Sequence, residues 1–128
     1  MTKPSDAALL NDYCMAACYS ADPDGVVLLP YNTETGELIP DVWARWLARD
    51  PVRMAPRYAD ALRGMRAIYI DAGNRDEYFL DLGAEAFRQA LAAISVTDVS
   101  FELFDAKHGG IEYRYPLSLR YLAERLAP

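Results

Sequence analysis

The chain is 128 residues long, the size of one small domain with its own hydrophobic core. Hydrophobic residues make up 52% of it and the formal net charge is −6, so a general affinity for the backbone of nucleic acids is not expected. No apolar run approaches the roughly 18 residues of a membrane-spanning helix, and no apolar signal segment follows residues 1–4. These features predict a soluble, cytoplasmic protein without a membrane or nucleic-acid partner.

The first predicted element is a helix that begins at Ser5, a capping residue type, and runs to about Ser20. Its spacing predicts one buried apolar stripe, formed by Leu10, Tyr13, Cys14, Ala17 and Cys18. On that stripe the only two cysteines of the chain are expected to be buried small hydrophobic residues with reduced thiols. Two other interpretations stay open: a pair of thiolate metal ligands completed from elsewhere, and a nucleophile paired with histidine.

The segment 21–64 is rich in proline and turn-forming residues, so we expect an insertion packed on a sheet. Turn residues at 21–25 precede the short apolar piece 26–29. A second turn at 32–36 separates it from the apolar piece 37–39, so a small hairpin is predicted. Helical pieces are expected from Asp41 to Arg49, from Asp50-Pro51 onward, and from Pro56 to Arg63.

The segment 66–110 organises the chain, because its hydrophobic pattern changes from strand to helix and back to strand. The runs 66–71 and 99–105 predict two parallel strands, and the helical spacing of 78–94 predicts the helix that connects them. The inner face of this helix is expected to carry Leu80, Ala84, Phe87, Leu91 and Ile94. A last helix is expected to begin at Pro116, with Leu119, Leu122 and Leu126 turned inward.

Asp76 and His108, the only histidine of the chain, each follow the end of one predicted strand. Because the carboxyl ends of parallel strands meet at one edge of a sheet, we expect the two side chains to lie at the same edge. A histidine acts as a base when a carboxylate holds its other ring nitrogen. The alternative is a surface aspartate and a partly satisfied histidine without a role in chemistry.

The stretches Ile68–Glu77 and Phe101–His108 resemble the last two strands of an α/β-hydrolase. The resemblance is closest to the esterase branch that includes enterochelin-esterase-like and S-formylglutathione-hydrolase-like proteins. It implies that Gly73-Asn74-Arg75-Asp76 supplies the acid of a catalytic triad and that His108 supplies the base. It covers nearly the whole chain and is most specific over residues 66–122. The stretch around Asp50-Pro51 resembles the family's segment before the penultimate strand, which is often part of the substrate cover.

The sequence departs from that family at the nucleophile, a serine in a Gly-x-Ser-x-Gly turn. No such turn occurs here; the serines are Ser5, Ser20, Ser95, Ser100 and Ser118. The chain therefore resembles the C-terminal half of such an enzyme, and the complete Ser-His-Asp mechanism does not carry over.

We predict an α/β fold with a partial α/β-hydrolase-like sheet of two parallel strands plus a hairpin, flanked by helices. The chain is expected to be a single truncated domain over 1–128, in which 1–64 is a helical cover and 65–128 is a strand-helix-strand-helix unit that carries the site. Because two parallel strands leave backbone groups unpaired at their edges, we expect oligomerisation, most simply a homodimer, to complete the sheet.

The predicted activity is hydrolysis of a small carboxyl or phosphate ester without a serine. Either His108, oriented by Asp76, activates water, or a divalent metal such as zinc does so, held by Asp76, Glu77 and His108. Further carboxylates near these ligands in the sequence are Asp71, Asp105 and Glu112. The substrate pocket is expected to include Trp43, Trp46 and Tyr78, for which core packing is the alternative. Two other functions stay open: an inactive C-terminal half of a serine esterase that needs a separate N-terminal half, and a non-enzymatic interaction module.

Overall fold

The structure is a computed structural model that describes residues 4–127. The chain forms two compact units, and it passes from the first to the second between Arg53 and Met54. The N-terminal unit contains α1 (Pro4–Tyr19) and α2 (Pro40–Leu47), and α3 (Pro51–Met54) spans the boundary. The C-terminal unit contains η1 (Ala55–Tyr58), α4 (Ala59–Arg63), β1 (Tyr69–Gly73), α5 (Leu80–Ala93), β2 (Ser100–Phe104), η2 (Glu112–Arg114) and α6 (Tyr115–Leu126).

Helix α1 lies where the sequence predicts it, but the expected buried stripe is wrong. Leu10 and Tyr13 are 53% and 44% exposed, and both Cys14 and Cys18 are exposed free thiols. The fully buried position of the helix is Ala16. The helix is therefore anchored through a small side chain and its C-terminal end, which leaves the apolar stripe on its outer side.

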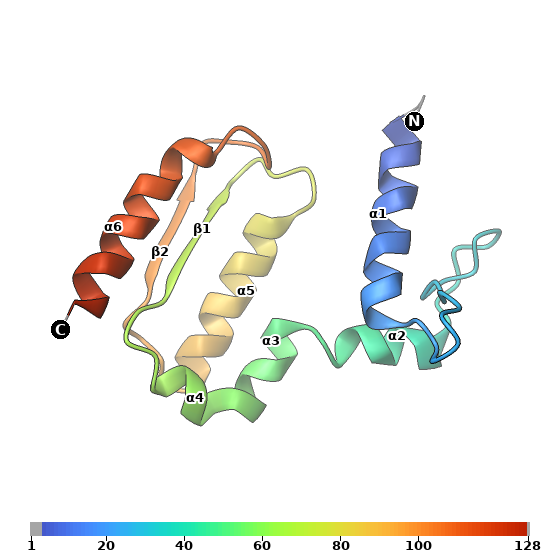
Figure 1. The fold of residues 1–128 in the computed structure, drawn as a ribbon, viewed down its shortest axis with the longest axis horizontal. Coiled ribbons are helices and arrows are strands. Elements are labelled where there is room, and N and C mark those ends of the chain that lie inside the picture. Colours follow the sequence, from blue (N-terminus) through green and yellow to red (C-terminus); the bar gives the residue numbers. More distant parts are fainter. Residues whose placement is uncertain (1–3, 128) are drawn as a thin grey trace. The chain divides into compact units, whose positions relative to one another are not determined.

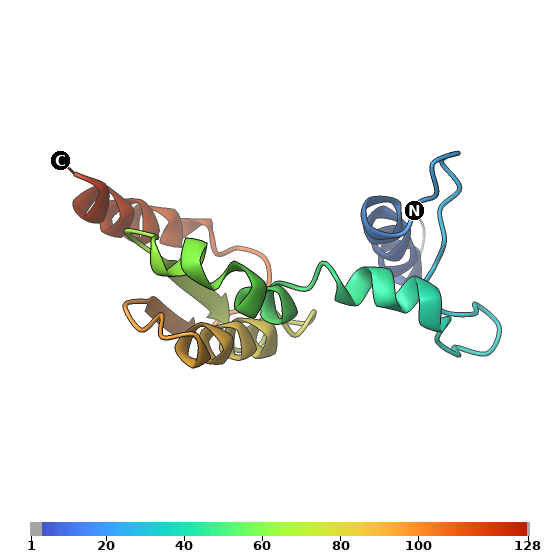
Figure 2. The ribbon, with the colours of Figure 1, turned by 90° about the horizontal axis from the view of Figure 1, so that it is seen from below.

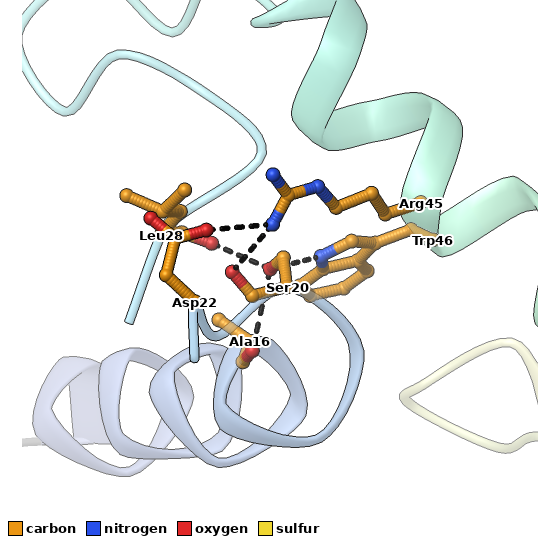
Figure 3. Close-up of polar contacts among 6 residues, drawn as sticks. All are labelled: Ala16, Ser20, Asp22, Leu28, Arg45 and Trp46. Carbon is orange, nitrogen blue, oxygen red and sulfur yellow. Dashed lines mark hydrogen bonds and ion pairs between the residues drawn. The ribbon is translucent and has the colours of Figure 1, made fainter. Parts of the chain in front are cut away.

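Ser20, at the end of α1, joins the three parts of the N-terminal unit (Figure 3). Its side chain is buried, with 1% of the residue exposed. The Ser20 hydroxyl donates to the carbonyl oxygen of Leu28 at 2.6 Å and accepts from the indole N–H of Trp46 at 2.9 Å. Arg45 of α2 adds contacts to the Ser20 carbonyl at 3.4 Å and to Asp22 at 3.0 Å. The C-terminal end of α1, the following turn and α2 are thus held by one hydroxyl and one guanidinium.

Replacing Ser20 with alanine is expected to lower the stability of the N-terminal unit by about 1–3 kcal/mol, because the Trp46 N–H and the Leu28 carbonyl lose their partner. Urea unfolding followed by tryptophan fluorescence measures this change, since both tryptophans of the chain belong to this unit. Thr35→Ala is the matched control in the same unit, because the exposed Thr35 hydroxyl accepts the Glu37 N–H at 3.2 Å within a surface turn. Equal effects of the two substitutions would contradict this role for Ser20.

The predicted turns of the N-terminal unit are confirmed, whereas the hairpin is reduced to a single antiparallel bridge between Tyr31 and Leu38. The side-chain oxygen of Asn32 accepts the backbone N–H groups of Glu34 and Thr35, which fixes the turn between the two apolar pieces. The predicted cap before α3 is also present, because an Asp50 carboxylate oxygen accepts the N–H of Val52 at 2.9 Å.

The C-terminal unit is a mixed α/β structure built on a two-stranded parallel sheet. Figures 1 and 2 show α5 on one face of the strands and α6 on the other. Tyr69 faces α6, where its ring lies 5.6 Å from that of Tyr121. The alternate residue Ala72, on the α5 face, is buried, as is Leu91 of α5. Residues 55–63, which the sequence grouped with the N-terminal cover, contact α5 through η1 and so belong to this unit.

The first strand is displaced toward the C-terminus from the expected 66–71. Its ladder pairs Tyr69 with Ser100, Asp71 with Glu102 and Gly73 with Phe104. Gly73 therefore lies in the strand and not in the loop, and the loop begins at Asn74. The apolar run predicts the strand but not its C-terminal end. That end is at Gly73, whose backbone lies close to the backbone of Ala106 and Lys107.

The inner faces of α5 and α6 are partly as predicted. On α5, Leu91 is fully buried, but Leu80 is 50% exposed. On α6, Leu119 and Leu126 are 64% and 51% exposed, so their predicted burial is wrong. Tyr121, which packs on Tyr69, takes part of the inner face in their place. None of the helices in the described part of the chain is long and apolar enough to cross a membrane.

Candidate active site

The loops that follow β1 and β2 are joined directly by backbone hydrogen bonds at the carboxyl edge of the sheet. The N–H of Asn74 donates to the carbonyl of Phe104 at 2.8 Å, and the N–H of Arg75 donates to the carbonyl of Ala106 at 3.0 Å. An ion pair of 2.7 Å between Arg75 and Asp105 lies on the outside of the same contact. These contacts bring the residues after Arg75 close to the residues after Ala106.

Gly73 makes this approach possible because it has no side chain. A Cβ atom at this position would lie 2.4 Å from the carbonyl oxygen of Ala106 and 2.7 Å from that of Lys107. Both contacts are with backbone atoms, so no flexible side chain can move aside. The glycine of the Gly73-Asn74-Arg75-Asp76 stretch therefore has a steric role, which is to let the loop before His108 pass over the end of β1.

Asp76 and His108 are brought together at this edge, as predicted. One carboxylate oxygen of Asp76 lies 3.1 Å from Nδ1 of His108, and the other accepts the backbone N–H of Tyr78 at 2.7 Å. Asp76 is 8% exposed, whereas half of the His108 side chain is open to solvent. The carboxylate is thus enclosed and fixed, and the imidazole is presented outward.

The electrostatic surroundings keep Asp76 ionised. Burial acts to raise the pKa of Asp76, but hydrogen bonds from the Tyr78 backbone, the His108 ring and the Leu80 backbone outweigh it and hold the pKa below its ordinary value. An ionised Asp76 accepts the N–H of His108 Nδ1. This selects the tautomer in which Nε2 carries a lone pair.

The Nε2 side of His108 is available for chemistry. Among the residues that the structure describes, no hydrogen bond is made to Nε2; the ring is bonded through Nδ1 alone. Tyr78, which the sequence placed in the substrate pocket, packs edge-on against the imidazole with the ring centroids 4.9 Å apart. The pair therefore has the arrangement of a base with a free proton-accepting nitrogen, in a half-exposed side chain beside an aromatic ring.

The third residue of the predicted metal set, Glu77, has a different role. One of its carboxylate oxygens accepts the backbone N–H of His108 at 3.2 Å, which steadies the loop. Across the described residues, no three His, Cys, Asp or Glu side chains gather closely enough to hold a metal ion. The predicted metal set of Asp76, Glu77 and His108 therefore finds no support in this geometry, because Glu77 is bonded to backbone.

Trp43 and Trp46 lie in the N-terminal unit, whereas Tyr78 lies with His108 in the C-terminal unit. The two indole rings are 6.2 Å apart, and the Trp46 ring lies 5.4 Å from that of Tyr19 in an edge-on contact. Together they line an open hollow of about 270 Å³ that also includes Pro51. With its indole N–H bonded to Ser20, Trp46 contributes to the packing of its own unit.

Sequence reasoning missed Arg114, which is only 9% exposed. It donates to Asp71 of β1 at 2.8 Å and to Glu102 of β2, and its guanidinium stacks 4.0 Å from the centre of the Phe104 ring. The hydrogen bonds that Arg114 donates to Asp71 and Glu102 raise its pKa above the ordinary value, the bond to Asp71 most. The pairing of β1 with β2 could have indicated the need for this arginine. It places Asp71 opposite Glu102, and two adjacent carboxylates need a cation.

Replacing Arg114 with methionine is expected to destabilise the C-terminal unit by about 3 kcal/mol, because Asp71 and Glu102 are left side by side without their cation. Urea unfolding followed by circular dichroism measures the change. Arg120→Met is the control, because its ion pair with Glu124 is exposed and is expected to contribute below about 0.5 kcal/mol. Adding Asp71→Asn to Arg114→Met is expected to restore part of the loss; a further loss would contradict this account.

The fold and the site define an α/β unit with an acid–base pair at the carboxyl edge of a parallel sheet. No model of a known protein family matches the chain, and no curated protein sequence matches it. Function is therefore argued from the geometry of the site.

Proposed function

We propose that the chain is a hydrolase of ester-type substrates in which His108, oriented by Asp76, activates water. The observation that carries the proposal is the contact between Asp76 and Nδ1 of His108, with Nε2 unbonded among the described residues in a side chain that is half exposed. A buried, ionised carboxylate behind a half-exposed imidazole is the arrangement that general base catalysis requires. The resemblance of the stretches Ile68–Glu77 and Phe101–His108 to the last two strands of α/β-hydrolases also supports hydrolysis as the function.

In the proposed reaction, Nε2 of His108 takes a proton from water as the water oxygen bonds to the ester carbon. The bond between that carbon and the leaving oxygen then breaks, and the imidazolium returns the proton to the leaving oxygen. Asp76 stays ionised throughout, since the hydrogen bonds of its site hold its pKa low, and it stabilises the imidazolium. Water replaces the serine that α/β-hydrolases use, because no Gly-x-Ser-x-Gly turn occurs in the sequence.

Hydrolysis of a panel of activated carboxyl and phosphate esters tests the proposal, with the parent protein and His108→Ala compared in the presence and absence of a chelator. Activity that is lost with His108→Ala and unaffected by the chelator is expected. Activity lost with the chelator as well would favour the metal-bound water that the donor geometry does not support. Turnover that survives in His108→Ala, or no turnover with any ester, would contradict the proposal.

A second candidate is that the Asp76–His108 pair serves a serine supplied by a separate N-terminal half. The sheet favours it: within the described residues, the outer edges of β1 and β2 make no backbone hydrogen bonds to other elements. A protein that is inactive alone and gains activity when mixed with an N-terminal half of an esterase would support this alternative. If the chain is inactive both alone and with the N-terminal half, this alternative is wrong, and a non-enzymatic interaction module is the function that stays open.

We further propose that the chain is a homodimer, since the unpaired edges of a two-stranded sheet are templates for pairing with another strand. A two-fold pairing of like edges would extend the sheet without requiring another protein. Sedimentation at micromolar concentration is expected to give twice the mass of the chain. A single species with the mass of the monomer would show that this proposal is wrong.

A further inference from the structure

Large apolar side chains are exposed in the loop after β1 and the first turn of α5, and the Tyr78 ring among them contacts the imidazole of His108. Tyr78, Phe79 and Leu82 are 54%, 68% and 64% exposed, and we refer to them as the apolar shelf. Exposed apolar residues are common singly, but four of the five residues 78–82 are exposed and apolar, since Leu80 is also 50% exposed, and together they form a local surface that a ligand can cover.

The shelf is held by the same hydrogen bonds that hold Asp76. The backbone N–H of Tyr78 donates to the Asp76 side chain at 2.7 Å, and the N–H of Phe79 donates to the Asp76 carbonyl at 3.2 Å. The Tyr78 ring contacts the His108 ring edge-on, so one end of the shelf touches the imidazole. A molecule bound on the shelf would therefore have one end beside the imidazole of His108.

Phe79 has a backbone φ of 60°, in the left-handed region that bulky residues rarely adopt. Asparagine or glycine would fit this conformation with less strain. The hydrogen bonds to Asp76 hold Phe79 in this conformation, and its ring stays 68% exposed two residues from Asp81 and three from Asp76 in the sequence, where a ligand can reach it.

The charges around the shelf limit the kind of ligand it can take. Asp76 and Glu77 are carboxylates whose pKa values are held below their ordinary values, and Asp81 lies in the first turn of α5. Lys107 is the neighbouring cation, while Arg75 is already paired with Asp105. The net local charge is negative, which disfavours an anionic phosphate ester relative to an uncharged carboxyl ester.

We infer that the apolar shelf binds the acyl chain of an uncharged carboxyl ester and places its carbonyl carbon near His108. This inference rests on the proposed function and narrows it: medium-chain acyl esters are preferred over acetyl esters, and phosphate esters are poor substrates. The chain lies along Phe79 and Leu82, and the carbonyl lies at the Tyr78 end.

The first measurement compares kcat/KM for 4-nitrophenyl acetate, octanoate and phosphate in the parent protein and in Phe79→Asn. The octanoate is expected to exceed the acetate by about tenfold in the parent, because added methylenes are partly removed from water on the shelf. In Phe79→Asn this preference is expected to fall to about twofold, with the denaturant midpoint unchanged or higher because asparagine tolerates the backbone conformation. Tyr58→Asn is the control, an exposed aromatic residue of the same unit on η1.

A binding measurement separates this inference from the proposed function. Since His108 is the only histidine, its imidazole proton resonances report the site without ambiguity. The uncharged ketone 2-decanone is expected to shift them in the parent and in Tyr58→Asn, but not in Phe79→Asn, whereas 2-butanone is expected to have little effect. If this pattern appears without ester hydrolysis, the shelf binds apolar ligands and the proposed hydrolysis is wrong.

If hydrolysis occurs with equal preference for acetate and octanoate, the proposed function stands and the shelf inference is overturned. No shift with 2-decanone, or equal shifts in Phe79→Asn and the parent, would also overturn it. A Phe79→Asn variant that changes from dimer to monomer would show that a second copy covers the shelf, which contradicts ligand binding there.

Discussion

Replacing Gly73 with alanine is expected to lower the stability of the C-terminal unit by roughly 1–3 kcal/mol and to reduce hydrolysis about 10²-fold. The added Cβ would lie 2.4 Å and 2.7 Å from the carbonyl oxygens of Ala106 and Lys107, so the loop that carries His108 must move. Moving that loop lengthens the 3.1 Å contact between His108 and Asp76. Urea unfolding, ester hydrolysis and the His108 resonances measure the three effects together.

Gly83→Ala is the matched control, since Gly83 lies within α5 and a Cβ there would meet nothing within 4 Å. Alanine is expected to raise stability by about 0.5–1 kcal/mol, because it restricts the unfolded chain and favours helix. The His108 resonances should keep their positions. If Gly73→Ala resembles Gly83→Ala in stability and activity, the close passage of the two loops has no role in placing His108.

The sequence predicts the centre of this fold because the relevant information is local. Alternation of apolar pattern identifies β1, α5 and β2, and the rule that parallel strands share one carboxyl edge places Asp76 near His108 without knowledge of any side-chain packing. The cap at Asp50 and the turn at Asn32 are local for the same reason. These features need only nearby residues and one topological rule.

Helix faces and partners of charged residues depend on distant neighbours and were not predictable in the same way. The stripe on α1 that holds Cys14 has the spacing of a core face, yet Cys14 is exposed and Ala16 is the buried residue of the helix. Leu119 is exposed although its spacing suited the inner face of α6. Arg114 binds Asp71, which is far away in the sequence, and only the strand register reveals the need for that cation.

The left-handed backbone conformation of Phe79 could not be predicted from the spacing of apolar residues either. The helical spacing placed Phe79 inside the helix predicted over 78–94, but α5 begins at Leu80 and Phe79 precedes it with a positive φ. The conformation follows from Asp76, which accepts the Tyr78 N–H with its side chain and the Phe79 N–H with its carbonyl. Enclosing the acid of the site thus dictates the backbone of the next residues, and it exposes their rings.

Replacing Asp76 with asparagine is expected to reduce hydrolysis about 10²–10⁴-fold, close to the effect of His108→Gln. Asparagine can still accept the Tyr78 N–H, but its amide no longer fixes the Nδ1–H tautomer of His108 or stabilises the imidazolium. The variant with both Asp76→Asn and His108→Gln is expected to be as active as the less active of the two single variants, because the two residues act as one unit. Glu77→Gln is the control: its carboxylate accepts backbone N–H groups, its own and that of His108, and a loss below about tenfold is expected.

The same variant gives a pH signature for the carboxylate. The pKa of Asp76 is lower in the folded protein than its ordinary value, so ionised Asp76 contributes stability at pH above that ordinary value. This contribution is lost as pH falls through the lowered native pKa, and it is absent at every pH in Asp76→Asn. The stability difference between parent and variant should therefore be constant near neutral pH and shrink only at strongly acidic pH, in urea unfolding at a series of pH values. A difference that already disappears between pH 7 and pH 5 would mean that Asp76 is not the enclosed, ionised partner of His108, and the base that the proposed hydrolysis needs would have lost its support.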